Sequence, residues 1–188
     1  MVLVAVVVLS ALAVPLSGGR LGALVDLRLR HLWAIYAALG LGVLALELPG
    51  LPDWLRSLLL VAAYPVGAVF LVANRRVPGM LLTGLGAALN LLAITANGGV
   101  MPASPAAMAT AGLADGPGFQ NSTVLADPRL AFLGDVFAVP ASWPLSNVFS
   151  VGDVLIAAGL VWGLYRICGS RLVPRWTGNA GASPAEPL

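Results

Sequence analysis

The chain has 188 residues, of which 59% are hydrophobic and 10% are charged, with a formal net charge of +2. A water-soluble domain of this length cannot hide so large an apolar fraction in its core, so the composition predicts a membrane protein. The basic residues are all arginines in short connections between apolar runs, which argues against a nucleic-acid partner. One cysteine, Cys168, excludes an internal disulfide and a cysteine-based zinc site, and we expect no metal or cofactor.

Five apolar runs follow one another along the chain. They approach the roughly 20 residues that cross a hydrocarbon layer of about 30 Å, and backbone in lipid must satisfy its own hydrogen bonds. We therefore expect an all-α integral membrane protein with five transmembrane helices and a long, partly structured outer loop. The first run lacks a basic start and a good cleavage site, so we expect a retained span rather than a signal peptide. The expected spans are residues 1–16, 31–48, 55–74, 79–97 and 150–168.

The arginines predict the orientation of this bundle. Eight of them share one side, which the positive-inside rule makes the cytoplasm, and the other side is left net acidic. We expect a bacterial plasma-membrane protein with its N-terminus outside and its C-terminus inside. Residues 169–188 would form a cytoplasmic tail, mostly disordered because it is small, polar and Pro-rich. The eight arginines are Arg20, Arg28, Arg30, Arg75, Arg76, Arg166, Arg171 and Arg175.

The stretch Arg28, Arg30 and His31 lies among leucines just before the second run. It is typical of an interfacial anchor whose arginines meet lipid headgroups. The alternative is a specific lipid-phosphate site.

The outer loop, residues 98–149, is long enough to be functional. Ser104 as N-cap, Pro105 at the first helical position and Gly112 as a stop predict a short helix over 105–111. The sequence FLGDVFAVP predicts a short strand or an extended segment. We expect Phe132 and Phe137 to pack against the bundle, so that the loop folds back over its outer mouth.

Small residues predict close contacts between helices. One stripe lies on the second run, at Ala34, Ala38, Gly42 and Ala45. A shorter one lies on the fourth run, at Gly84 and Ala88.

Polar residues recur every seven positions along the fourth run, at Thr83, Asn90 and Asn97, and so share one helical face. They predict either interhelical hydrogen bonds or a polar track into a binding pocket. Gly98 and Gly99 extend this track, because paired glycines permit a sharp turn whose amides could hold an anion or a substrate carbonyl.

Two aspartates are candidates for chemistry. Ser150 and Asp153 form an S-x-x-D capping box at the start of the fifth run, and Asp135 lies among apolar residues near the membrane surface. Two carboxylates brought together cannot both ionise, so one keeps a proton while the other can activate water. Asp153 is thus a helix cap, half of a catalytic pair, or both.

The stretch FLGDVF, followed by FSVGDVLIAAG, resembles the C-terminal half of lipoprotein signal peptidases over residues 132–160. That resemblance implies an aspartate-dependent hydrolase with Asp135 and Asp153 as its catalytic pair. Ser150 and Gly152 stand where that family has Asn and Ala. The Asn-Leu-Ile-Asp-Arg stretch of that family is absent, and the first outer loop is short.

Most of the chain also resembles an uncharacterised family of bacterial multi-pass membrane proteins, found mainly in Gram-positive lineages and defined only as a domain of unknown function. The segments SGGRLGALVDLRLRHLW, NGGVMPAS and FLGDVF to VFSVGDVLIAAG carry this resemblance. It implies a fold and no activity.

Three functions remain open at this level. The first is a non-enzymatic membrane component that binds the lipid bilayer or a membrane or extracytoplasmic protein partner. The second is the aspartate-dependent membrane hydrolase. The third is a small-solute transporter that uses the polar track of the fourth run.

Overall fold

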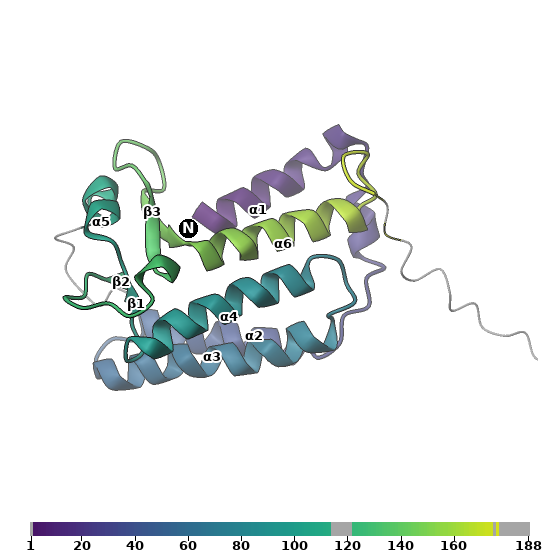
Figure 1. The fold of residues 1–188 in the computed structure, drawn as a ribbon. Coiled ribbons are helices and arrows are strands. Elements are labelled where there is room, and N and C mark those ends of the chain that lie inside the picture. The colour runs from purple at the N-terminus through teal and green to yellow at the C-terminus, as the bar shows by residue number, and fades with distance from the viewer. Residues whose placement is uncertain (1, 114–121, 175, 177–188) are drawn as a thin grey trace, which may run out of the picture.

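The computed structural model describes residues 2–113, 122–174 and 176. Five helices lie side by side as a bundle (Figure 1), and each falls within three residues of an apolar run predicted from the sequence. They are α1 (Val2–Ala13), α2 (Leu32–Glu47), α3 (Asp53–Ala73), α4 (Met80–Ala96) and α6 (Val151–Ile167). Short 3-10 turns, Pro15–Ser17 and Leu21–Leu24, follow α1. The predicted disorder of the tail falls largely on residues 175 and 177–188, outside the described residues.

Residues 98–113 and 122–149 form a layer across one end of the bundle (Figure 1), which we call the end layer. It is not purely helical. It contains two small sheets, because β1 pairs in parallel with β2 and β3 pairs in antiparallel with β4. The strand β4 runs directly into α6. The elements of the end layer are β1 (Met101–Pro102), α5 (Pro105–Ala111), β2 (Ser122–Thr123), a 3-10 turn at Ala131–Leu133, β3 (Asp135–Val139) and β4 (Asn147–Ser150).

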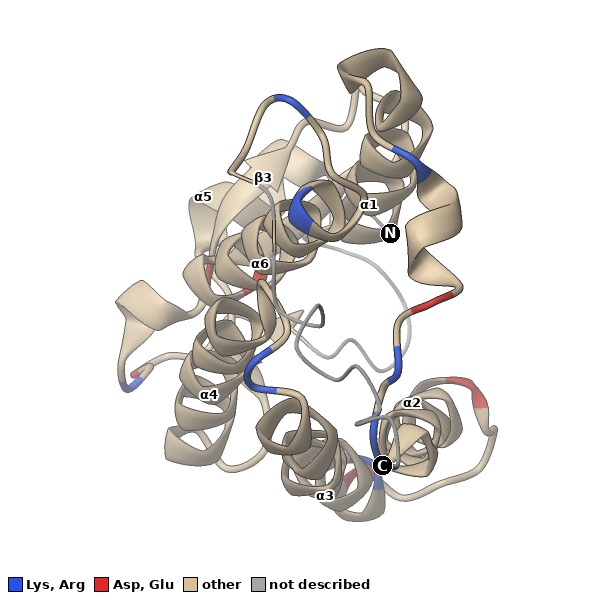
Figure 2. Ribbon diagram, turned by 90° about the vertical axis from the view of Figure 1, so that its right-hand side faces the viewer, with Lys and Arg blue, Asp and Glu red and all other residues tan. Residues whose placement is uncertain are grey.

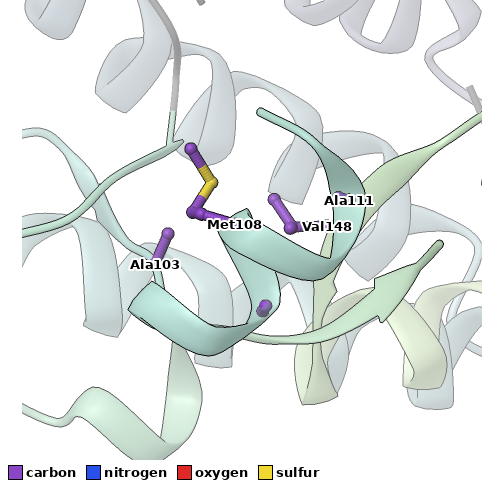
Figure 3. Packing of buried hydrophobic residues seen from close by; sticks show 5 residues of the cluster. Ala103, Met108, Ala111 and Val148 are labelled. Atoms are coloured by element: carbon purple, nitrogen blue, oxygen red, sulfur yellow. The ribbon is translucent and has the colours of Figure 1, made fainter. Parts of the chain in front are cut away.

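The predicted helix is confirmed, and of the two alternatives for FLGDVFAVP the structure has the strand, as β3. The helix α5 begins after Ser104 and ends at Gly112, whose left-handed backbone closes it. Met108 and Ala111 of α5 pack with Ala103 and with Val148 of β4 as a small hydrophobic core (Figure 3). The end layer therefore holds together through its own side chains as well as through the bundle.

The expected packing of Phe132 against the bundle is wrong, since this side chain is 67% exposed. The 3-10 turn points its neighbour Leu133 inward instead, where Leu133 packs with Ile94 of α4 and Met101. Phe137 is also exposed and stacks on Phe149 across the β3–β4 pair, with ring centroids 5.4 Å apart. The side chains of Phe132 and Phe137 are thus largely exposed and do not form the contact between layer and bundle.

The bundle is built from two tightly packed helix pairs, α2 with α3 and α4 with α6. Arg56 near the start of α3 is buried and joins the first pair. Its guanidinium donates to the carbonyls of Ala45, Leu48 and Leu51 at distances of 2.6, 2.8 and 3.1 Å. These carbonyls lie at or beyond the end of α2, where helical backbone lacks partners and a cation is favoured.

Glycines bring the backbones of α4 and α6 close together. A Cβ on Gly159 would lie 2.7 Å from the Thr83 nitrogen and 2.8 Å from the Gly79 carbonyl oxygen, and Gly86 faces Gly152 in the same way. The predicted stripes were partly wrong. Ala34 and Ala45 are buried, but nothing lies within 4 Å of a Cβ added to Gly42.

Among the described residues, α3 is the helix long and apolar enough to cross a membrane by length and composition. The helices α1, α2 and α4 are apolar but shorter, with 12, 16 and 17 residues. At 1.5 Å per residue, α1 is about 18 Å long, less than a hydrocarbon core of about 30 Å. The structure thus establishes a mostly helical chain with one candidate span.

The α4–α6 contact predicts that Gly159→Ala destabilises the protein by about 1–3 kcal/mol, because backbone atoms must move to admit the methyl group. Gly42→Ala is the matched control. Alanine there meets open space in a helix interior and should be neutral or stabilising by up to about 1 kcal/mol. Thermal unfolding of the purified chain in detergent measures both. Equal midpoints for the two variants would contradict the close contact.

Candidate functional site

The start of α6 carries the predicted capping box. The Ser150 hydroxyl accepts a hydrogen bond from the Asp153 amide at 3.0 Å, and the Asp153 carboxylate accepts one from the Ser150 amide at 3.1 Å. Both halves of the motif are therefore present, and the helix-cap interpretation of Asp153 is confirmed.

Asn90 of α4 extends this cap into a closed ring of hydrogen bonds. Its amide nitrogen donates to Asp153 Oδ1 at 2.8 Å, and its amide oxygen accepts from the Ser150 hydroxyl at 2.8 Å. Asn90 is buried, and any Cβ on Gly152 would collide with its side chain. The absence of a side chain at Gly152 is thus what lets Asn90 reach the cap.

Asp135 lies beside this ring because it is paired with Ser150 across the β3–β4 ladder. The Ser122 hydroxyl donates to Asp135 Oδ2, and the Asp135 carbonyl accepts from the Ser104 amide at 3.0 Å. Asp135 is only 4% exposed. We call Asn90, Ser122, Asp135, Ser150 and Asp153 the polar junction.

Burial raises the pKa of Asp135 from 3.8 to about 6. The hydrogen bond from Ser122 lowers this pKa, and the charge of Asp153 raises it. Tyr64 of α3 also lies within electrostatic reach of both carboxylates. The two predicted aspartates therefore belong to one partly buried cluster, in which Asp135 can hold a proton up to about pH 6.

The internal hydrogen bonds of the junction constrain its chemistry. Both oxygens of Asp153 accept from N–H groups, the arrangement suited to a carboxylate that only accepts. Of the two Asp135 oxygens, Oδ2 is engaged by Ser122. The Asp153 bonds thus join α4, the end of β4 and the start of α6.

The other predicted binding residues lie apart from this ring. Thr83 is buried against Gly159, and its hydroxyl has no hydrogen-bond partner among the described residues. Asn97, at the end of α4, donates to the Arg129 carbonyl and accepts from the Arg129 amide, both at 2.8 Å. The face they share with Asn90 is used for contacts within the protein.

Gly98 and Gly99 both have left-handed backbone, as the predicted sharp turn requires. Their amides donate to the carbonyls of Thr95 and Ile94 at 3.4 and 2.9 Å. These two amides therefore close the end of α4 and do not point toward a ligand.

Sequence reasoning missed Ser122, Gly152 and Tyr64 as neighbours of the aspartates. Ser122 belongs to a two-residue strand, too short to leave a periodic signal, and its parallel partner β1 lies about twenty residues earlier. Gly152 lies inside the S-x-x-D motif, but its role depends on which helix packs there. No local pattern could have identified Tyr64 on α3.

Neither Asp135 nor Asp153 lines any of five cavities in the described part of the chain. An apolar groove of about 440 Å³ lies between α3 and α4, and one of about 390 Å³ between α1 and α6. One of about 310 Å³ lies within the end layer. Two polar cavities, of about 510 and 310 Å³, lie among the arginines at the opposite end.

The described residues contain no group of three or more His, Cys, Asp or Glu side chains that could hold a metal ion. The hydrogen-bonding partners in the junction are serine and asparagine, with two carboxylates.

A family model described as a family of unknown function, DUF5317, matches residues 26–165. The chain belongs to this family. The matched segment runs from just before α2 to near the end of α6, so it contains every residue of the polar junction. Because the function of this family is unknown, membership does not point to any particular activity.

An uncharacterized protein of Thermotoga maritima is 29% identical to the chain over 105 residues. That alignment covers 56% of this chain and 61% of the Thermotoga protein. No solved structure matches the chain.

The raised pKa of Asp135 predicts a pH-dependent stability. The folded state holds this proton more tightly than the unfolded chain, so the free energy of unfolding falls as pH rises from about 4 to about 6. The full contribution, on the order of 2–3 kcal/mol, is present below about pH 4 and lost above about pH 6. Asp135→Asn should remove this slope, as measured by thermal unfolding in detergent across that range.

Asp127→Asn is the control, since Asp127 is exposed. It should leave the slope of the wild-type chain unchanged. Identical pH profiles for the wild-type chain and Asp135→Asn would contradict the protonation of a buried Asp135.

Proposed function

We propose that the chain is a multi-pass bacterial plasma-membrane protein with five spans. The outward faces of its helices support this, because they carry exposed large apolar side chains such as Leu9, Tyr36 and Leu81. Soluble proteins rarely expose such extended apolar surface. The most apolar 18-residue stretch of α3 is only 11% buried, unlike the core helix of a soluble protein. Residues 1–168 would form the membrane bundle and residues 169–188 a cytoplasmic tail.

The distribution of charge supports an orientation with the N-terminus outside and the C-terminus in the cytoplasm. Figure 2 views the bundle from the end opposite the end layer and shows basic residues gathered on its connections. At the other end, the guanidinium of Arg56 is buried and donates hydrogen bonds to carbonyls at and beyond the end of α2. The positive-inside rule then puts the arginine end in the cytoplasm and the end layer outside.

Within that membrane we propose a non-enzymatic component that binds lipid or a membrane partner. The observation that carries this proposal is the internal use of the polar junction. Both oxygens of Asp153 accept hydrogen bonds that join α4, β4 and α6, which supports a structural role for this residue. Three of the cavities described above lie instead against apolar helix faces or among the arginines around the end of α3, surfaces suited to lipids.

An aspartate-dependent membrane hydrolase is the second candidate. It is favoured by the raised pKa of Asp135 next to Asp153, since acid–base hydrolysis uses a carboxyl group that can hold a proton beside a second carboxyl group. The resemblance of residues 132–160 to lipoprotein signal peptidases points to the same two residues. The transporter alternative has no such support, because Thr83, Asn90 and Asn97 contact the protein itself.

A cleavage assay separates the two candidates. We expect the purified wild-type chain in liposomes not to cleave a lipidated prolipoprotein peptide. The cleavage rate should equal the background rate measured with empty liposomes. Cleavage that disappears in both Asp135→Asn and Asp153→Asn but persists in Asp127→Asn would overturn the non-enzymatic proposal and establish the hydrolase.

The orientation is tested with single cysteines in a Cys168→Ser background. We expect Ser142→Cys in the end layer to react with a membrane-impermeant maleimide in bacterial protoplasts or spheroplasts, whose plasma membrane is intact. Asp26→Cys, at the arginine end, should react only after permeabilisation. Both positions are exposed in the structure. Three proposed spans, α2, α3 and α4, separate the two positions, so labelling of both cysteines from the same side would contradict this part of the topology.

A further inference from the structure

Four arginines surround one cavity at the arginine end. Arg28 and Arg30 come from the segment before α2, and Arg75 and Arg76 follow α3, more than forty residues later. The cavity has a volume of about 310 Å³, and none of the described residues that line it is acidic. Four like charges around one space favour an anion at that place.

Asn74 fixes the geometry of this cavity. Its side chain donates to the Arg30 carbonyl at 2.8 Å and accepts from the Arg30 amide at 2.9 Å. A further bond runs to the Phe70 carbonyl at 2.8 Å, and Asn74 is buried. The buried side-chain amide of Asn74 therefore fixes the segment that carries Arg28 and Arg30 next to Arg75 and Arg76.

The apolar groove between α3 and α4 begins where this cavity ends. Arg75 lines both spaces. From Arg75 the groove follows one face of α3 back to Tyr64, a distance of about 16 Å along the helix. Val72, Leu81 and Leu85 of its walls are exposed, so the groove is open along the outside of the bundle.

We propose that these two adjoining spaces form a binding site for an anionic phospholipid. The phosphate diester would lie among Arg28, Arg30, Arg75 and Arg76, whose guanidinium groups match phosphate oxygens. One acyl chain would lie along the α3–α4 groove. The site deepens the proposed membrane-binding function and rests on it for the location of this end at the bilayer surface.

The phosphate half is tested on the purified full chain in neutral detergent. Native mass spectrometry gives lipid binding, with phosphatidylglycerol, phosphatidylcholine and inorganic phosphate as probes. We expect the wild-type chain to prefer phosphatidylglycerol over phosphatidylcholine by about ten-fold or more. The double variant Arg75→Gln/Arg76→Gln should lose that preference.

The double variant Arg20→Gln/Arg171→Gln is the matched control. It removes the same charge from the same end of the bundle, but neither residue lines the cavity. It should keep the preference for phosphatidylglycerol. Equal losses in the two double variants would overturn the site and indicate general charge attraction. Thermal unfolding without lipid checks that both variants are folded.

The acyl half is tested by filling the groove. Gly84→Leu adds a side chain where only Leu71 comes within 4 Å, and Gly42→Leu on α2 is the control in open space. We expect Gly84→Leu to weaken phosphatidylglycerol binding and Gly42→Leu to leave it unchanged. Inorganic phosphate that binds as tightly as phosphatidylglycerol, together with no effect of Gly84→Leu, would identify the occupant as a free phosphate. The lipid proposal would then fail.

These outcomes are separable from the proposed topology. Failure of lipid binding with the expected cysteine labelling would reject this site alone. Specific phosphatidylglycerol binding with reversed labelling would support the site and reject the orientation.

Discussion

The close approach of α4 to α6 is the constraint on which the rest of the structure depends. Glycines on both helices remove the side chains that would separate them, so Asn90 can reach the first turn of α6. A buried amide needs partners, and the capping box of Ser150 and Asp153 supplies them. Because Ser150 also ends β4, the same bonds fix the strand that pairs with β3. Helix packing thereby positions the end layer.

This arrangement gives the two aspartates different roles. Asp153 is held by donors on both oxygens and belongs to the frame of the protein. Asp135 is buried one strand away, and burial together with the charge of Asp153 makes its proton harder to remove. A proton on Asp135 lowers the cost of burying two carboxylates in one cluster, since two adjacent charges would repel each other. Asp153 is thus held by its hydrogen bonds, whereas the raised pKa of Asp135 follows mainly from burial.

An asparagine amide also secures a connection at each end of the bundle. Asn74 at the end of α3 clamps the backbone of Arg30, and Asn97 at the end of α4 clamps that of Arg129. Each uses one donor and one acceptor, as a neighbouring strand would. At the arginine end the clamp gathers positive side chains around an open cavity, and at the other end it ties the end layer to α4. One device thus produces a charged surface in one place and a closed contact in the other.

The sequence by itself determined the local features: five helices, the short helix of residues 105–111, the strand after Leu133 and the S-x-x-D cap. Each depends on residues within a few positions, where periodicity, capping and turn chemistry act. Tertiary structure alone decided that Asn90 joins Ser150 and Asp153, that Ser122 meets Asp135, and that Leu133 rather than Phe132 faces the bundle. Those contacts link residues 13 to 63 positions apart or depend on the turn between elements, so no local pattern encodes them. The glycines of α4 and α6 were visible in the sequence, but which helices they face was settled only by packing.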